Sequence, residues 1–187
     1  MKTCILLRHG VTDMAGRFCG HSDPPLNDSG RAQFERAASL LATPPDVVFT
    51  SDLLRAKESA QILAARFGVP VQISPGLREI DFGAWENLSW QEIEHRFPAE
   101  SSKWLDCFPA GVIPAGERYD LFVDRVKREM DFLVMQAQAK ALIAVTHAGF
   151  IRAALAEIYG TAFDDAFRLS REYGAIIDLS RAEAGAE

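Results

Sequence analysis

The sequence of 187 residues has few cysteines, no long apolar run and no excess of basic residues, and each absence excludes a class of protein. The three cysteines, Cys4, Cys19 and Cys107, are odd in number and widely spaced. This pattern argues against a disulfide framework and for a reducing compartment, so we expect a cytoplasmic protein. The most apolar stretch, 140–155, contains a histidine and an arginine, and no stretch approaches the ~20 apolar residues of a membrane span.

The charge and the N-terminal pattern exclude two further classes. The formal net charge is −6 at pH 7, whereas general nucleic-acid binding usually needs a basic surface. The N-terminal apolar run is short, ends in a charged pair and is followed by no small-residue cleavage site, so we expect no secretory signal. Fifteen of the twenty basic residues are arginines, whose guanidinium groups bind phosphate or carboxylate through two hydrogen bonds.

Short apolar runs alternate with longer stretches of helical spacing along most of the chain. The runs predict buried strands at 4–7, 46–50, 69–73, 141–146 and 175–179. Between them we predict helices at 27–41 with Asn27 as N-cap, at 52–67 with Ser51 as N-cap and Gly68 as the stop, and at 88–96, 117–139 and 149–160. This alternation predicts an α/β fold, a three-layer αβα sandwich with a central, mainly parallel sheet.

The length of the chain favours a single domain over residues 1–187. One segment interrupts the regular pattern, because 98–116 contains three prolines. We expect this segment to be an inserted loop that lies over one end of the sheet, at the active-site edge.

Histidines and arginines gather where three of the predicted strands end. Arg8 and His9 follow the first strand, Arg55 lies in the first turn after the second, and His147 follows the fourth. Open parallel sheets bind their ligands beyond the carboxyl ends of the strands, so we expect these side chains to converge. Guanidinium groups, imidazolium groups and helix N-termini all favour a dianion, and the pattern therefore predicts a phosphate site.

Five segments of the sequence match, in order, the motifs of one protein family. These are an R-H-G-x-T opening, a G-x-x-D-x-P-L-T-x-x-G segment, an S-D-L-x-R-A helix start, an L-x-E-x-x-F-G-x-W-E block and a T-H-G/A-G turn. They lie at 7–12, 20–30, 51–56, 77–86 and 146–149. The sequence thus resembles the histidine phosphatase superfamily, whose fold is called phosphoglycerate mutase-like, over nearly its whole length. One R-H-G motif is a weak signal, whereas five in order are a strong one.

The resemblance implies a role for each residue of the strand-end cluster. His9 would be the nucleophile that forms a phosphohistidine, while Arg8, Arg55 and His147 would hold the phosphoryl oxygens. Glu79 would protonate the leaving alcohol and then take a proton from water. Further positions that would contact the substrate are Gly10, Thr12, Cys19, Gly20, Ala148 and Gly149.

The loop after the first strand departs from the family pattern in two ways. Position 15 is alanine where relatives commonly carry asparagine, and the loop 11–20 is shorter than theirs. We therefore expect one phosphate-side hydrogen bond to be missing or supplied from elsewhere, with the activity retained.

Within the family, the block 78–86, Trp90 and the Trp104 segment resemble the α-ribazole phosphatases. Such enzymes remove the 5′-phosphate of α-ribazole 5′-phosphate during assembly of the cobalamin nucleotide loop. The short interval from Glu79 to His147 favours hydrolysis over a mutase reaction, which needs a lid that keeps water away. The alternatives are a broad-specificity or sugar-phosphate phosphatase, a phosphoglycerate mutase, and a catalytically silent phospholigand-binding protein.

The residue pattern predicts a reaction without a metal ion or other cofactor. No histidines and carboxylates have the compact spacing of a metal motif such as H-E-x-x-H. We expect the partner to be a small phosphorylated metabolite rather than a nucleic acid or a membrane. The sequence leaves open whether the protein is a monomer or a homodimer.

Overall fold

The computed structural model describes residues 2–41 and 43–181 of the chain. Its centre is a five-stranded sheet with the strand order β3-β2-β4-β1-β5. The strands are β1 (Cys4–Arg8), β2 (Val47–Thr50), β3 (Val71–Ile73), β4 (Leu142–Thr146) and β5 (Ile176–Asp178). The first four pair in parallel, and β5 runs antiparallel to β1 at the edge. The predicted mainly parallel sheet is therefore confirmed.

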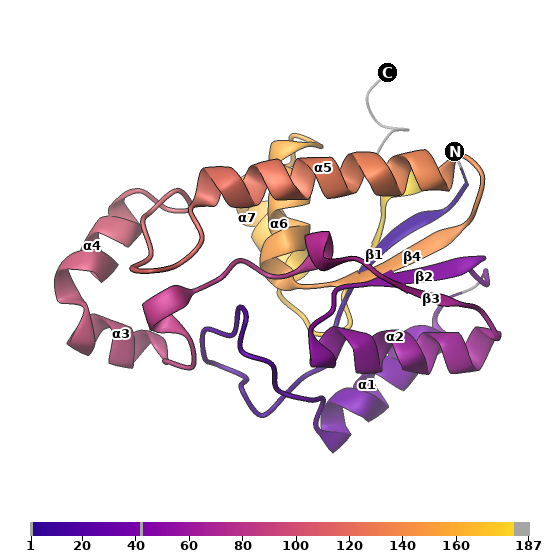
Figure 1. The fold of residues 1–187 in the computed structure, drawn as a ribbon, viewed down its shortest axis with the longest axis horizontal. Helices are drawn as coiled ribbons and strands as arrows, with labels where there is room; N and C mark the ends of the chain where they lie inside the picture. The colour runs from indigo at the N-terminus through magenta and orange to yellow at the C-terminus, as the bar shows by residue number, and fades with distance from the viewer. Residues whose placement is uncertain (1, 42, 182–187) are drawn as a thin grey trace.

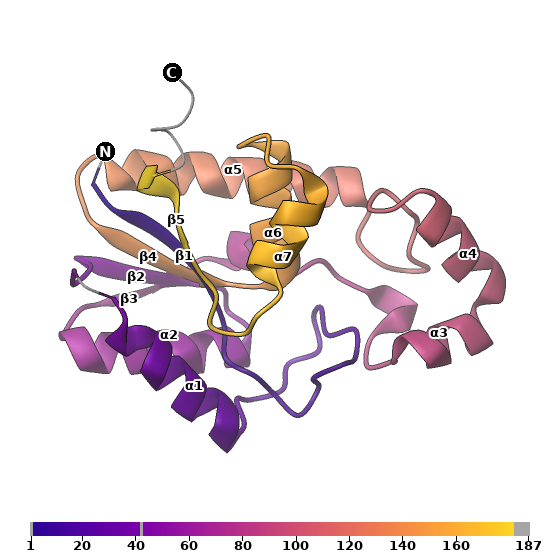
Figure 2. The ribbon, with the colours of Figure 1, turned by 180° about the vertical axis from the view of Figure 1, so that it is seen from behind.

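Helices cover both faces of this sheet, as the two views in Figures 1 and 2 show. On one face lie α1 (Asp28–Ser39) and α2 (Leu54–Phe67), and on the other lie α5 (Tyr119–Ala137) and α6 (Ala148–Glu157). Successive strand residues point to opposite faces. Leu7 accordingly packs into the core beneath α1 and α2, whereas Leu6 packs into the core beneath α5 and α6. The predicted three-layer αβα sandwich is confirmed.

Local signals set several helix ends. Asn27 caps α1 as predicted, since its side chain accepts a hydrogen bond from the N–H of Gly30 at 2.8 Å. α2 ends at Gly68 as predicted, in the left-handed conformation that glycine adopts readily, with φ of 67°. The helix α3 (Trp90–Arg96) begins with a capping box in which Ser89 and Glu92 exchange hydrogen bonds.

The predicted start of α2 is wrong. The helix begins at Leu54, with Leu53 in the N-cap position and no side-chain cap. The hydroxyl of Ser51 instead lies 2.8 Å from Nε2 of His147, the residue that directly follows the neighbouring strand β4. The Ser51 side chain therefore forms a long-range hydrogen bond instead of capping the helix.

The chain between β3 and β4 extends beyond the sheet. It contains two 3₁₀ turns, Pro75–Leu77 and Gly83–Trp85, then α3 and α4 (Pro98–Asp106), which Figure 1 shows away from the strands. The segment 98–116, predicted to be a loop, thus begins with a helix. Proline is tolerated at the first helical position, where its missing N–H is not needed.

The C-terminal part holds one helix that the sequence pattern does not predict. α7 (Phe163–Ser170) follows α6 and packs against it, and a 3₁₀ turn, Leu179–Arg181, follows β5. At eight residues α7 is short, so its stability comes from packing on α6 rather than from a long apolar pattern. The C-terminal end of α7 and the turn after it lie against the end of β1, next to the predicted site.

Candidate active site

The neighbouring ends of β1 and β4 bring two histidines together. Arg8 pairs with Thr146 in the sheet, and the N–H of His9 donates to the carbonyl of Thr146 at 3.0 Å. His9 and His147 therefore leave adjacent strands side by side, with ring centroids 4.9 Å apart. The strand β2 borders β4, and the helix that follows it places Arg55 beside both rings.

The His9 imidazole is held as a neutral base. Its Nδ1 lies 2.7 Å from the carbonyl oxygen of Gly10, which can only accept, so Nδ1 carries the proton. Nε2 keeps its lone pair, to which the Nε–H of Arg55 donates at 3.2 Å. Burial, with the charges of Arg55 and Arg8, holds the pKa of His9 well below its usual range. At neutral pH, His9 therefore presents an unprotonated nitrogen.

Arg55 is a buried cation that backbone carbonyls hold in place. Its side chain, in a residue only 1% exposed, donates to the carbonyl of Ser22 at 2.7 Å, of Gly20 at 2.8 Å and of Cys19 at 3.1 Å. Among the described residues no carboxylate forms an ion pair with it. Its charge is therefore available to an anionic ligand.

Arg8 is fixed from the C-terminal side of the fold. Its guanidinium stacks on the ring of Tyr173, with Cζ 3.9 Å from the ring centroid, and donates to the carbonyls of Ser170 and Arg171. The Nε atom is buried and has no hydrogen-bond partner within the described part of the chain. Burial lowers the pKa of Arg8, but an arginine remains charged in a protein. A phosphoryl oxygen would satisfy the free donor.

His147 is fully buried, and one of its nitrogens is fixed by a hydroxyl. The Oγ atom of Ser51 accepts from the N–H of Leu53 at 3.2 Å, so that its own proton can be donated to Nε2 of His147 at 2.8 Å. Nδ1 then carries the ring proton, and it is buried without a partner among the described residues. Burial, with Arg55 and other nearby positive groups, holds the pKa of His147 well below its usual range.

Both buried histidines make stability depend on pH. Their pKa values are depressed in the folded protein, so below pH ~6.5 the unfolded chain takes up protons that the folded chain does not. We therefore expect the free energy of unfolding to fall between pH 7 and 5, by up to about 1.4 kcal/mol per pH unit for each histidine. Urea unfolding measures this free energy in wild type, in His9→Asn and in the exposed control His95→Asn. We expect it to depend less steeply on pH in His9→Asn than in the other two proteins. An identical slope in all three proteins would contradict this prediction.

The Glu79 carboxylate faces the N-terminus of α6. Its Oε2 accepts from the N–H of Gly149 at 2.9 Å, and its Oε1 accepts from the N–H of Ile80 at 3.0 Å. The residue is 7% exposed, and it lines two adjoining cavities, one of which contains His9. Glu79 is thereby placed where it can exchange a proton with a ligand bound at His9.

Gly149 is needed for this placement. A Cβ atom at position 149 would overlap Oε1 of Glu79 and would also crowd its other carboxylate atoms. We expect Gly149→Ala to displace the carboxylate and to lower kcat for an alkyl phosphate by about tenfold to a hundredfold. Steady-state kinetics measure this effect. Gly160→Ala, where a Cβ meets no atom but the φ of 65° disfavours alanine, is the comparison for a loss of stability away from the site. Unchanged kcat in Gly149→Ala would show that the position of the carboxylate does not matter.

The loop around Cys19 is held by one carboxylate. The side chain of Glu86 accepts from the N–H groups of Gly20, His21, Ser22 and Phe82 and from the hydroxyl of Ser22. Burial raises the pKa of Glu86, but these hydrogen bonds lower it further, to below its usual range. The carbonyls that hold Arg55 thus belong to a loop that Glu86 anchors.

The cavity in front of His9 has a volume of about 270 Å³. Its lining includes Thr12 and Cys19, two of the positions predicted to contact the substrate. Arg8, Glu79, Phe18 and Tyr173 are among the other residues that line it. Burial raises the pKa of the Cys19 thiol, which therefore stays protonated. Ala15, where relatives commonly carry asparagine, is exposed and does not line the cavity, whereas its neighbours Gly16 and Arg17 do.

The other predicted glycines serve packing. A Cβ at Gly10 would overlap the carbonyl oxygen of Gly30, and one at Gly20 would overlap that of Ile80. Neither residue lines either of the two cavities at the site. Their small size therefore allows two backbone segments to approach each other.

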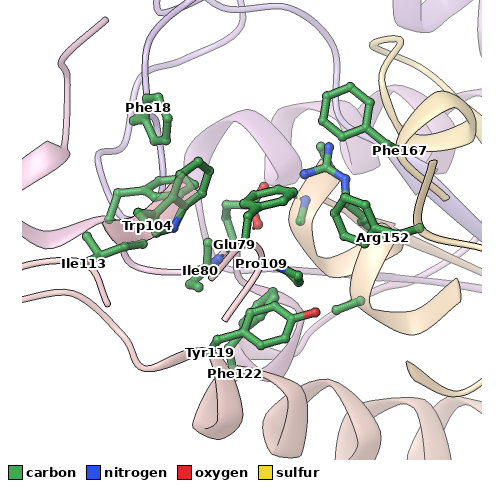
Figure 3. A pocket seen from close by; sticks show the side chains of 16 residues that line it. Phe18, Glu79, Ile80, Trp104, Pro109, Ile113, Tyr119, Phe122, Arg152 and Phe167 are labelled. Carbon is green, nitrogen blue, oxygen red and sulfur yellow. Dashed lines mark hydrogen bonds between the residues drawn. The ribbon is translucent and has the colours of Figure 1, made fainter. Parts of the chain in front are cut away.

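A second cavity, of about 250 Å³, adjoins the first and shares Glu79, Phe18 and Phe82 with it. Figure 3 shows Glu79 near its middle, between Trp104 and Ile113 on one side and Arg152 and Phe167 on the other. The predicted contact residues Ala148 and Gly149 line this cavity and not the first. Together the two cavities can hold a phosphate dianion at His9 and a bulky group beyond Glu79.

Comparison with known proteins agrees with this geometry. The sequence matches the model of the histidine phosphatase superfamily (branch 1) over residues 4–187, and the chain therefore belongs to this superfamily. It is 31% identical over 156 residues to an adenosylcobalamin/α-ribazole phosphatase of Salmonella typhimurium, covering 82% of this chain and 77% of the relative. It is 32% identical over 177 residues to a glucosyl-3-phosphoglycerate phosphatase of Mycolicibacterium vanbaalenii, covering 88% and 77%.

Solved structures show the same similarity. The crystal structure of the α-ribazole phosphatase from Shigella flexneri superimposes with a TM-score of 0.83 at 26% identity, covering 93% of this chain and 88% of that one. The chain spans only 40% of the length of three mycobacterial relatives, among them a bifunctional protein of Mycobacterium tuberculosis, to which it is 33% identical over 147 residues.

Two further observations concern the described residues alone. Within 2–41 and 43–181, no three histidine, cysteine, aspartate or glutamate side chains lie close enough together to hold a metal ion. None of the helices in the same ranges combines the length and the apolar composition needed to cross a membrane.

Proposed function

We propose that this protein is a phosphomonoesterase that works through a phosphohistidine at His9, without a metal ion. The observation that carries the proposal is the unprotonated Nε2 of His9, set among Arg8, Arg55 and His147. A neutral imidazole nitrogen is a nucleophile, and three positively polarised groups around it favour the phosphoryl dianion.

The reaction then has two steps on the same residues. In the first, Nε2 of His9 attacks phosphorus, the bond from phosphorus to the alcohol oxygen breaks, and Glu79 gives its proton to the leaving alcohol. In the second, Glu79 takes a proton from water as the water oxygen attacks the phosphohistidine, which frees phosphate and His9. The Nε–H of Arg55, which donates to His9 Nε2, is free to donate to a phosphoryl oxygen once Nε2 bonds to phosphorus.

Three groups would stabilise the charge of the transition state. Arg55 is positioned by carbonyls and Arg8 by stacking on Tyr173, so both guanidinium groups are oriented before the substrate arrives. The Nδ1–H of His147 supplies a further donor. The two guanidinium groups supply the positive charge that a metal ion would otherwise provide, which supports a metal-independent reaction.

We propose α-ribazole 5′-phosphate as the substrate, in assembly of the cobalamin nucleotide loop in the cytoplasm. Support comes from the α-ribazole phosphatases among the relatives and solved structures, and from the second cavity, which has room for a group beyond the phosphate. A phosphatase for a glucosylated phosphoglycerate is the second candidate, since such an enzyme is similarly close in sequence.

Phosphate release in the presence of EDTA tests the first part of the proposal. We expect activity on 4-nitrophenyl phosphate to be unchanged by EDTA and not raised by added Mg²⁺ or Zn²⁺. The substrate is tested by comparing kcat/KM for α-ribazole 5′-phosphate, glucosyl-3-phosphoglycerate, 3-phosphoglycerate and fructose 2,6-bisphosphate. Loss of activity in EDTA would contradict the metal-independent mechanism, and a preference for another ester would replace α-ribazole 5′-phosphate.

A further inference from the structure

The second cavity is lined by aromatic side chains. Eight aromatic residues from separate parts of the chain line it: Phe18, Phe82, Trp104, Phe108, Tyr119, Phe122, Phe163 and Phe167. Figure 3 shows Phe18 and Trp104 on one side of Glu79, Phe167 on the other, and Tyr119 below. The volume of about 250 Å³ is below the ~300–1,000 Å³ of sites that hold whole drug-sized ligands, so the cavity suits one part of a substrate.

The position of Glu79 identifies that part. Glu79 lines both cavities, and it is the residue that would protonate the leaving alcohol of a phosphate ester at His9. A group attached to the alcohol oxygen therefore extends from the first cavity into the second. The lining favours a flat, apolar group, because aromatic side chains pack well against the faces and edges of an aromatic ring.

Arg152 is the one cationic side chain among the described residues that line this cavity. Its guanidinium lies over the ring of Phe167, with Cζ 4.2 Å from the centroid, and its Nε is buried without a hydrogen-bond partner in the described part of the chain. It forms no ion pair with the described residues, and the Tyr119 hydroxyl is already bound to Glu157 at 3.1 Å. Arg152 as a whole is half-buried, but a buried N–H without an acceptor is unfavourable, so this geometry is suited to a ligand that supplies one.

We infer that Arg152 is a specificity-determining residue for the leaving group: the aromatic cavity takes an aromatic ring of the alcohol, and the guanidinium donates to an acceptor atom on that ring. The acceptor can be a ring nitrogen, as in the benzimidazole of α-ribazole, or a carboxylate. This inference rests on the proposed phosphatase function. It assigns Arg152 to the leaving group rather than to the phosphate, because Arg152 does not line the cavity that contains His9.

Three phosphate esters of one shape test the inference: benzyl phosphate, 3-pyridylmethyl phosphate and 3-carboxybenzyl phosphate. We expect wild-type kcat/KM to be about tenfold or more higher for at least one acceptor-bearing ester than for benzyl phosphate. Arg152→Met should reduce this preference to about one. Arg128→Met removes an exposed arginine from α5 and should keep the wild-type preference. The acceptor-bearing ester with the higher kcat/KM shows whether the site takes a ring nitrogen or a carboxylate.

Two results would overturn the inference: no preference for an acceptor in wild type, or a preference that survives in Arg152→Met. Arg152→Lys, which keeps the charge but loses the planar fork, gives a second measurement if the methionine variant does not fold. Calorimetric binding of the three corresponding alcohols requires no turnover and should show the same ranking and the same loss. If the esters are not hydrolysed but the alcohols bind in this ranking, the proposed function fails, while binding of an acceptor-bearing ring at Arg152 stands.

Discussion

The variant His9→Ala is expected to lose phosphate release from 4-nitrophenyl phosphate by about four to six orders of magnitude. The reason is that the two-step reaction requires a nitrogen that bonds to phosphorus. No other described residue offers an unprotonated nitrogen inside the cavity between Arg8 and Glu79. Acid-labile labelling of the wild-type protein with ³²P from substrate, absent in His9→Ala, measures the intermediate directly.

A matched control separates chemistry from folding. His95→Ala makes the same substitution at an exposed position of α3 and should retain full activity. Circular dichroism of both variants should show the wild-type content of helix and strand. Turnover by folded His9→Ala within about tenfold of wild type would remove His9 as the nucleophile.

The second large effect is expected in Glu79→Gln, and it should depend on the leaving group. For an alkyl phosphate, kcat/KM should fall by about 10²–10⁴, because the alkoxide cannot leave easily without a proton. For 4-nitrophenyl phosphate the fall in kcat/KM should be less than about tenfold, since nitrophenolate leaves as a stable anion. Removal of the base for the second step should also produce a burst of nitrophenol, followed by slow turnover.

Stopped-flow absorbance measures this burst, and steady-state assays with both esters measure the difference between them. Glu94→Gln, at an exposed position of α3, is the matched control and should leave both esters unaffected. An equal loss for both esters in Glu79→Gln would indicate that the carboxylate holds the site together rather than transferring protons. Glutamine keeps the shape of glutamate, and its one oxygen can still accept from one of the two backbone N–H groups that Glu79 binds.

The residues of the strand ends could be predicted because local pattern and a general rule of topology agree there. Short apolar runs identified β1, β2 and β4, and the chemistry-bearing residues follow them directly in sequence. The rule that parallel strands present their carboxyl ends at one edge then places His9 beside His147. Neither inference needs the contacts of a single side chain, which is why both could be made without coordinates.

The supporting residues could not be predicted in this way. Ser51 has the sequence context of a helix cap, yet it binds His147, which follows another strand. Tyr173 stacks on Arg8 from a turn that no motif marks. Such pairs depend on how distant segments pack, and residue type alone does not specify the partner of a hydroxyl or a ring. The same holds for Arg152, whose sequence position in α6 indicates only a helix residue.

The anchoring of the loop by Glu86 has a consequence for how the site can vary. The N–H groups of residues 20–22 donate to Glu86, which directly follows the distant 3₁₀ turn Gly83–Trp85. The carbonyls on Arg55 keep their places as long as this carboxylate does, whatever lies between β1 and Cys19. Insertions, deletions and exchanges in residues 13–17 are thereby uncoupled from the placement of Arg55. That stretch is the part of the active-site wall that can change in length and composition while the reaction stays the same.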